Sequence, residues 1–201
     1  MLPVFIGTPP IDDWESEGSL PRGILPTGHT MLDQSLPAGG WTSSALNEVL
    51  IDTCGVGELR LMWPALADLT ARGEHVALIA PPYRIYPPIW IRAGIDSRRL
   101  LLVQANEPEA AWAAEQCLRS GSFGAVICWP QQANDRALRR LQAAAEAGCA
   151  FAFAYRSIHE AVNPSPAALR LVIETNPLQL RILKCRGALH KTRPLPASAW
   201  S

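Results

Sequence analysis

Short apolar runs alternate with amphipathic stretches along most of the chain. The expected strands span residues 45–51, 75–80, 100–104, 125–129 and 150–155. They lack the polar–apolar alternation of a half-solvated strand, so we expect both of their faces to be buried. The expected helices between them span residues 58–71, 87–93, 108–119 and 134–148. This order predicts a parallel sheet with right-handed crossovers and helices on both faces, an α/β fold.

Helix signals support this interpretation at several positions. Thr27 is a candidate N-cap for a short helix at 31–36, and Asn134 for the helix that Gly148 ends. Pro64 lies inside the expected helix 58–71 and cannot donate an interior hydrogen bond. It is therefore expected to kink that helix or to mark its first turn.

The pattern of apolar and polar residues changes after residues 163–166. The segments ALRLVIET and LQLRILKC alternate more regularly and are separated by Asn176-Pro177, which predicts a hairpin or an antiparallel edge. Residues 1–22 are rich in Pro, Gly and acidic side chains, which indicates a flexible leader. Residues 188–201 read as an irregular basic tail. We therefore expect one folded domain at 23–187.

Composition narrows the function classes. Hydrophobic residues make up 48% of the 201, and 18 basic residues balance 18 acidic ones, so no global charge attracts nucleic acid or anionic lipid. The five cysteines include no C-x-x-C pair, and we expect reduced structural thiols and no metal site. The N-terminus has no basic start with a sustained apolar core, and no apolar run reaches transmembrane length. These features predict a cytoplasmic protein without a membrane partner.

The segment EVLIDTCGVGELRLM, residues 48–62, has the strand–turn–helix form of a P-loop. In that motif backbone N–H groups hold the phosphates, a Lys neutralises their charge, and a Ser or Thr binds Mg²⁺. Here Asp52 stands at the first glycine position and Gly57 at the second, while Glu58 replaces the Lys and Leu59 the Ser or Thr. Two unit charges about 4 Å apart interact by roughly 4 kcal/mol at an effective dielectric constant near 20. A carboxylate at position 58 therefore turns attraction for a phosphate into repulsion of similar size, and we expect no nucleotide cofactor.

The order of segments resembles a known family. The segments TGHTMLDQSLPAGGW, HVALIAPPY, AGIDSRRLLLVQ and AVICWP, with the glycine turn, resemble the ATPase core of RecA. Within that superfamily, GVGELRLMWPALADLTARG, WAAEQCLRSGSFGAVICWP and RALRRLQAAAEAG resemble the ImuA family of translesion-synthesis cassettes. This resemblance covers about residues 25–187 and implies a RecA-like three-layer α/β/α fold, with a mostly parallel sheet and an antiparallel C-terminal edge. The cell-division inhibitor SulA is similar over about residues 57–156.

The resemblance also assigns two further catalytic positions. The metal-binding acid of RecA-like ATPases would fall at Trp129, and the water-activating glutamate at Pro82. Neither side chain can hold a metal or accept a proton, so the resemblance implies a degenerate site and a protein that is not an enzyme. The loop SIHEAVNPSPA, near the RecA loop that contacts DNA, has no Lys or Arg. Direct contact with DNA therefore stays open. The best remaining catalytic candidates, Cys54 and Asp52, have little around them to support the assignment.

Two surfaces are candidates for partner binding. One is basic and lies on the last strand and the tail, comprising Arg181, Lys184, Arg186, Lys191 and Arg193, with Trp200 near the end of the chain. The other is the loop PPYRIYPPIW, with Tyr83, Tyr86 and Trp90, at the carboxyl end of a strand where open α/β sheets place their sites. The alternatives are a solvated edge strand protected by positive charge, a rigid loop over the sheet, and a Trp200 that folds back onto its own domain.

The favoured hypothesis is a non-catalytic adaptor in SOS-induced, error-prone translesion synthesis. The ImuA resemblance implies that it links ImuB, an inactive relative of Y-family polymerases, and an error-prone polymerase to damaged DNA, with RecA as a further contact. The first alternative is a SulA-like division inhibitor that binds the tubulin-like FtsZ. The second is a RecA-like nucleotide-binding ATPase.

Overall fold

The computed structural model describes residues 23–55, 57–106, 109–187 and 194–200. The strands of the main sheet are, in chain order, β3 (Ala45–Ile51), β4 (Val76–Ile79), β5 (Leu100–Val103), β6 (Ala125–Cys128), β7 (Phe151–Ser157), β8 (Leu169–Thr175), β9 (Leu178–Cys185) and β10 (Leu195–Pro196). Across the described residues their spatial order is β10-β9-β8-β3-β7-β6-β4-β5. The leader expected at 1–22 lies outside these residues.

The sheet is mixed. The strands from β8 through β3 to β5 run parallel, whereas β9 pairs antiparallel with β8 and β10 pairs antiparallel with β9. The predicted C-terminal hairpin is therefore confirmed, as β8 and β9. Two strands, β7 and β6, lie between β3 and β4, which follow one another along the chain. That separates this sheet from the doubly wound orders in which the first strand lies beside the second.

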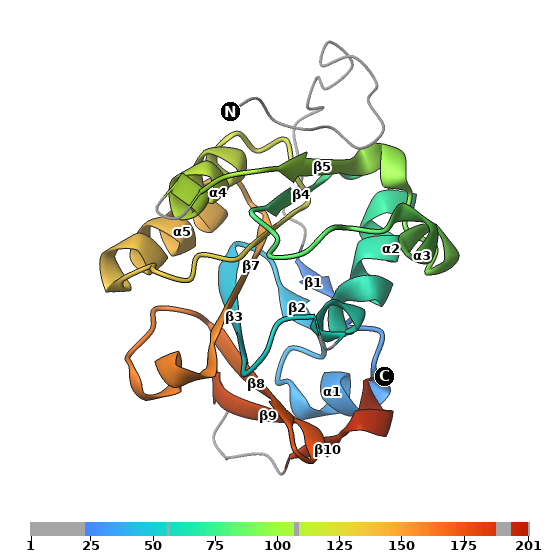
Figure 1. Cartoon of the computed structure of the whole chain (residues 1–201), viewed down its shortest axis with the longest axis vertical. Helices are drawn as coiled ribbons and strands as arrows, with labels where there is room; N and C mark the ends of the chain where they lie inside the picture. The colour runs from blue at the N-terminus through green and yellow to red at the C-terminus, as the bar shows by residue number, and fades with distance from the viewer. Residues whose placement is uncertain (1–22, 56, 107–108, 188–193, 201) are drawn as a thin grey trace.

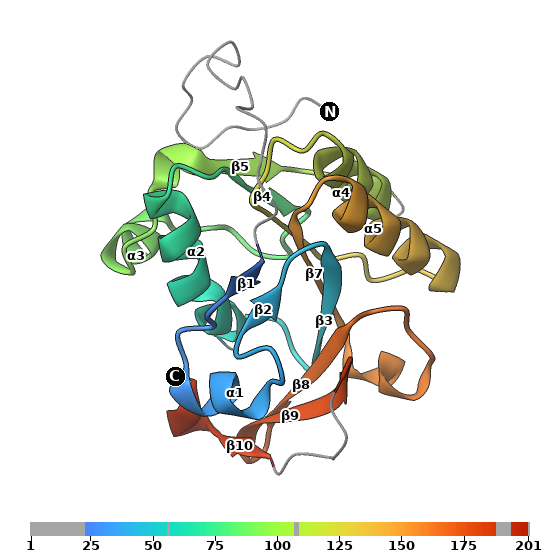
Figure 2. The same cartoon turned by 180° about the vertical axis from the view of Figure 1, so that it is seen from behind.

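Helices cover both faces of the sheet. The helical elements are α1 (Thr30–Ser35), η2 (Glu58–Met62), α2 (Trp63–Ala71), α3 (Pro87–Arg92), η3 (Ser97–Arg99), α4 (Glu109–Arg119), α5 (Asp135–Ala147), η4 (Ile158–Val162) and η5 (Ala197–Ala199). In Figures 1 and 2, α4 and α5 lie together on one face, while α2 and α3 lie on the other. The mostly parallel, two-sided α/β arrangement expected from the sequence is thus observed, while its RecA-like assignment stays a prediction.

Side-chain alternation divides the core into two apolar layers. In β7, Phe151, Phe153 and Tyr155 point into the layer beneath α2. The small residues Ala152 and Ala154 of the same strand point into the layer beneath α4 and α5. Because small side chains leave room for a close helix, the pattern AFAFAY fixes which helices can pack on which face.

The helix boundaries follow local chemistry. Asn134 caps α5, because its side chain accepts a hydrogen bond from the Ala137 N–H at 2.9 Å. Pro64 lies at the start of α2, after the short 3-10 turn η2, so the expected first-turn position is confirmed. The expected N-cap at Thr27 is wrong. Helix α1 begins at Thr30, and the Thr27 hydroxyl instead accepts a hydrogen bond from the His29 N–H.

The first and last described segments of the chain both belong to the folded domain. A two-stranded antiparallel sheet forms from β1 (Ile24–Leu25) and β2 (Trp41–Thr42). The last described residues, 194–200, contribute β10 to the main sheet and η5, which packs against α1 and β9. The tail was expected to be irregular over 188–201. That expectation is wrong for 194–200, because apolar residues of this segment, Leu195 and Trp200, are buried in the core.

Candidate functional site

Three connections meet at the carboxyl edge of the parallel strands. They follow β3, β4 and β6 and carry the glycine turn, the proline–aromatic loop 81–90, and Trp129. Parallel α/β sheets place their ligand sites at this edge. The structure therefore brings together the glycine turn, expected to be a degenerate phosphate loop, and one of the two surfaces expected to bind a partner.

The glycine turn is closed by its own carboxylate. Gly57 precedes η2 with φ +92°, a left-handed conformation that glycine adopts without strain. Glu58 then folds back into the turn, and the Gly55 N–H lies 3.1 Å from each carboxylate oxygen. The Glu58 side chain is buried, with the residue only 1% exposed. An N–H group that a functional P-loop would direct at a phosphate is used here by a side chain of the protein.

Aromatic residues fill the space next to this turn. The Trp129 ring stacks on Tyr155 with centroids 5.3 Å apart, and Tyr83 meets Trp129 edge-on at 6.1 Å. The Tyr155 hydroxyl donates to the Glu58 carbonyl at 3.3 Å. Trp129, expected at the lost metal-binding position, is thus a core residue, and Pro82, expected at the lost glutamate position, is exposed.

The Tyr83 hydroxyl lies close enough to the Glu58 carboxylate for that charge to act on it. Burial raises the pKa of Tyr83 far above its ordinary value, and the neighbouring Glu58 charge raises it further. Burial, followed by the charge on Glu58, also raises the pKa of Tyr155. Both phenols therefore stay protonated throughout the neutral range.

A groove of about 330 Å³ lies between the glycine turn and the proline–aromatic loop. Gly55, Glu58 and Leu59 line it from the turn and η2, and Tyr83 from the opposite loop. Its remaining lining residues include Arg60, Trp63, Arg84, Ile85, Tyr86, Ile89 and Trp90. Tyr86 and Ile89 are 63% and 45% exposed, so apolar side chains continue from the groove onto the surface. We call this site the turn groove.

Two of the expected partner-binding aromatics are buried instead. Trp90 is only 4% exposed and packs in the core beneath α3. Trp200 is only 3% exposed and belongs to the same apolar cluster as Leu32 and Leu195, and η5, which precedes it, packs against α1. Neither can be an exposed anchor, and Trp200 follows the fold-back alternative. Tyr83 is half-buried, whereas Tyr86 is available at the surface.

The expected basic surface is only partly assembled. In β9, Arg181 and Lys184 would lie on opposite faces of an unbroken strand, but a register shift leaves Leu183 unmatched and returns both to one face. Arg181 forms an ion pair with Glu174 at 2.9 Å, and the Lys184 ammonium donates to the Ser165 carbonyl. Arg186 is exposed beside them. Lys191 and Arg193 lie outside the described residues.

Burial lowers the pKa of Lys184, and the positive charges of Arg170 and Arg186 lower it further. This places the three side chains within electrostatic reach of one another. With Arg181 neutralised by Glu174, the surface is less strongly basic than the sequence suggested.

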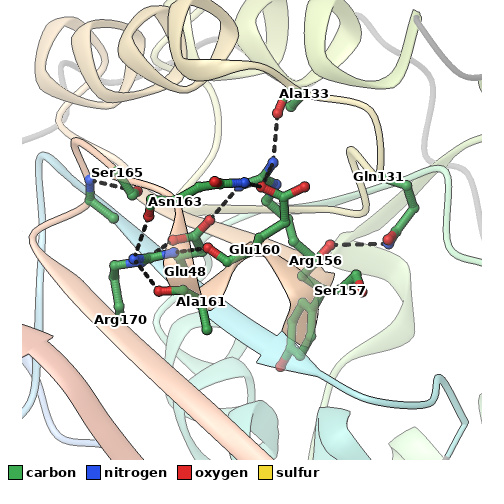
Figure 3. Close-up of polar contacts among 12 residues, drawn as sticks. Glu48, Gln131, Ala133, Arg156, Ser157, Glu160, Ala161, Asn163, Ser165 and Arg170 are labelled. Atoms are coloured by element: carbon green, nitrogen blue, oxygen red, sulfur yellow. Dashed lines mark hydrogen bonds and ion pairs between the residues drawn. The ribbon is translucent and has the colours of Figure 1, made fainter.

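A buried charge cluster lies on the other face of the sheet, and the sequence analysis missed it. Glu48 on β3 accepts from Arg156 on β7 at 2.7 Å and from Arg170 on β8 at 2.5 Å (Figure 3). Arg156 also pairs with Glu160 at 3.1 Å, so two guanidinium groups face two carboxylates. The signal was present in the sequence as charged residues inside otherwise apolar strands, ALNEVLI, FAFAYRS and LRLVIET.

This cluster anchors a loop. Arg170 donates to the carbonyls of Glu160 at 2.8 Å and Asn163 at 2.9 Å, and Arg156 donates to the Ala133 carbonyl at 2.6 Å. Figure 3 shows these carbonyls converging on the two guanidinium groups. The loop 158–163 stands where the RecA resemblance would place a DNA contact. Here the basic groups are Arg156 and Arg170 of the sheet, and they form hydrogen bonds and ion pairs within the protein.

The catalytic candidates receive no support from their surroundings. Burial raises the pKa of the Cys54 thiol, and the Glu58 carboxylate raises it further, which disfavours the reactive thiolate. Asp52 is exposed at the end of β3. Among the residues that the structure describes, no group of three or more His, Cys, Asp or Glu side chains could hold a metal ion. No helix in the same residues is both long enough and apolar enough to cross a bilayer.

Comparison with known proteins finds a similarity to a cell division inhibitor. No protein-family model matches the chain. The chain is 29% identical to the cell division inhibitor SulA of Pseudomonas aeruginosa over 150 residues, which covers 67% of this chain and 93% of SulA. The crystal structure of the same SulA matches with 29% identity and a TM-score of 0.48, over 56% of this chain and 97% of that one. The chain is therefore SulA-like in sequence over nearly the whole length of SulA, while its resemblance to ImuA stays a prediction.

Proposed function

We propose that this protein is a SulA-like inhibitor of cell division that acts by binding another protein and not by catalysis. The observation that carries the proposal is the sequence similarity to SulA, which extends over 93% of that inhibitor's length. The adaptor hypothesis favoured by the sequence patterns has no comparable support, so the order of the two hypotheses is reversed. We further infer a RecA-like domain with a vacated phosphate loop.

The site geometry supports a role without catalysis. The glycine turn has the strand–turn–helix form expected of a P-loop, but Glu58 uses the Gly55 N–H and lies where a triphosphate would need a cation. Trp129, Tyr155 and Tyr83 pack together beside it. A nucleotide would have to displace a hydrogen-bonded carboxylate and an aromatic cluster at the same time. A surface released from nucleotide binding can instead serve as a protein-binding surface.

The partner that follows from a SulA-like role is FtsZ, and the expected action is to prevent its polymerisation. Purified FtsZ with GTP should scatter light as it assembles, and adding this protein should lower the scattering in proportion to its concentration. The same protein denatured by heat should have no effect. If assembly is unchanged with this protein in molar excess over FtsZ, the proposed function is wrong.

A second candidate is the translesion adaptor. One observation favours it: about a third of the chain lies outside the match to SulA, which covers 67%. Pull-down of ImuB and RecA by the purified protein tests this role directly. A division inhibitor should retain FtsZ and neither of these two, whereas an adaptor should show the reverse. For either role, a fluorescent ATP analogue should not bind.

A further inference from the structure

The turn groove has the size and walls of a site for protein side chains. Its volume of about 330 Å³ lies at the lower end of the range of about 300–1,000 Å³ typical of concave binding sites. Leu59, Trp63 and Ile85 supply apolar walls, and Tyr86 and Ile89 extend them to the surface. Exposed apolar side chains that are contiguous with a groove and rimmed by polar residues mark interaction sites. The groove therefore fits an aliphatic or aromatic side chain.

The rim of the turn groove is positively charged. Arg60 from η2 and Arg84 from the opposite loop both line it and are both exposed. Arg60 lies over the Trp63 ring at 5.7 Å. Within the described ranges no ion pair joins either guanidinium to a carboxylate. Glu58, which also lines the groove, is buried and bonded to Gly55. Two cations that no carboxylate of the described residues neutralises therefore flank an apolar cavity.

The floor of the groove selects against phosphate. The Gly55 N–H is already used by the Glu58 carboxylate, whose negative charge lies inside the turn. A polyphosphate that followed the glycine turn would meet this charge. A carboxylate that stays at the rim, carried by a segment whose apolar side chain enters the groove, meets only Arg60 and Arg84. Guanidinium groups suit carboxylates because of their planar donor geometry.

We propose that the turn groove is the docking site for an acidic segment of the partner protein, in which an aliphatic or aromatic side chain is flanked by carboxylates. This inference rests on the proposed function, because it names the surface with which the inhibitor would hold FtsZ. The apolar side chain occupies the cavity between Trp63 and Ile85, and the flanking carboxylates pair with Arg60 and Arg84. Nucleic acid is the competing occupant and is excluded by the same experiment.

The test compares charge reversals and polar replacements with matched controls. Arg60→Glu and Arg84→Glu reverse the rim, and Arg136→Glu reverses an exposed arginine on α5. Ile89→Asn makes the groove polar, and Val162→Asn changes another exposed apolar side chain, 88% accessible on η4. All five positions are exposed, so the variants should fold, and thermal unfolding checks this. Binding of each variant to labelled FtsZ is measured by fluorescence anisotropy at low and high NaCl.

The expected result is a weakening of about tenfold or more for each groove variant, the scale of a central interface residue. The two controls should bind within about twofold of wild type. Added NaCl should weaken wild-type binding more than that of Arg84→Glu, because the reversed rim has lost its favourable charge. If wild type binds and the groove variants bind equally well, this inference is wrong while the proposed function stands. If wild type does not bind FtsZ, the proposed function fails and this inference with it. Binding of a labelled single-stranded oligonucleotide that Arg84→Glu abolishes would overturn the carboxylate assignment.

Discussion

Substitution of Glu58 tests most directly whether its carboxylate stabilises the glycine turn. Replacing Glu58 with Ala removes the acceptor for the Gly55 N–H, together with one buried methylene group. Replacing it with Gln keeps the shape and a neutral acceptor but removes the charge. We expect both variants to fold, and Ala to be the more destabilising.

The magnitude follows from three contributions. A hydrogen bond to a charged acceptor contributes about 1.5–3 kcal/mol to stability. The one buried methylene group that is lost contributes about 0.8 kcal/mol. Relief of a buried carboxylate offsets part of this loss, by about 1–2 kcal/mol on the scale of protein mutational data for buried polar groups. The net expectation is a loss of about 1–2 kcal/mol for Glu58→Ala and below about 1 kcal/mol for Glu58→Gln, the balance of these terms.

Urea unfolding followed by tryptophan fluorescence measures these values. The control is Glu109→Gln at the exposed start of α4, where we expect a change below about 0.5 kcal/mol. The reasoning is refuted if Glu58→Ala unfolds within about 0.5 kcal/mol of wild type, the ordinary range for an unremarkable surface change. It is also refuted if Gln is the more destabilising of the two.

Three further predictions concern the same elements. Because the pKa of Tyr83 is raised above its ordinary 10.0, its contribution to stability is present below pH 10 and lost above it. Tyr83→Phe should therefore make unfolding free energy less dependent on pH between about 10 and 11.5, by up to about 1.4 kcal/mol per pH unit, in urea titrations at each pH. The double variant Glu58→Lys with Leu59→Thr should not hydrolyse ATP in a phosphate-release assay, because Pro82 and Trp129 occupy the positions where the RecA resemblance would place catalytic acids; measurable turnover would contradict the proposed vacated site. Trp200→Ala should cost about 3–5 kcal/mol as a buried residue, whereas Trp112→Ala, at an exposed position, should cost below about 1 kcal/mol. Equal losses for the two tryptophans would show that the tail does not pack into the core.

Much of the fold could be predicted from local patterns. Apolar runs located the parallel strands, and Asn134, Gly148 and Pro64 marked helix ends, because these signals act over a few residues. The spatial order of the strands could not be predicted from such local signals. It depends on which faces fit across distant segments, such as the alanines of β7 beneath α4 and α5.

The candidate site was predicted less completely, and the reason is again distance along the chain. Glu58 in place of the motif's Lys indicated that a phosphate would be repelled, but not that the carboxylate bonds its own turn. For Trp90 and Trp200 the sequence left both partner binding and packing on the domain open. Their burial depends on an apolar cluster built from segments far apart in the chain, which no local pattern encodes. The shared face of Arg181 and Lys184 required a bulge that alternation alone does not show.

The buried cluster of Glu48, Arg156 and Arg170 also acts on how the sheet assembles. One carboxylate on the central strand β3 is matched to an arginine on each neighbour, and Glu48 lies directly opposite Arg170 in the register. A slip of one residue by β8 would turn Arg170 toward the apolar layer beneath α2 and leave Glu48 without a partner on that side. Misaligned pairings therefore bury an uncompensated charge, which costs several kcal/mol. A single glutamate thus favours the correct alignment of three strands that lie far apart in the sequence.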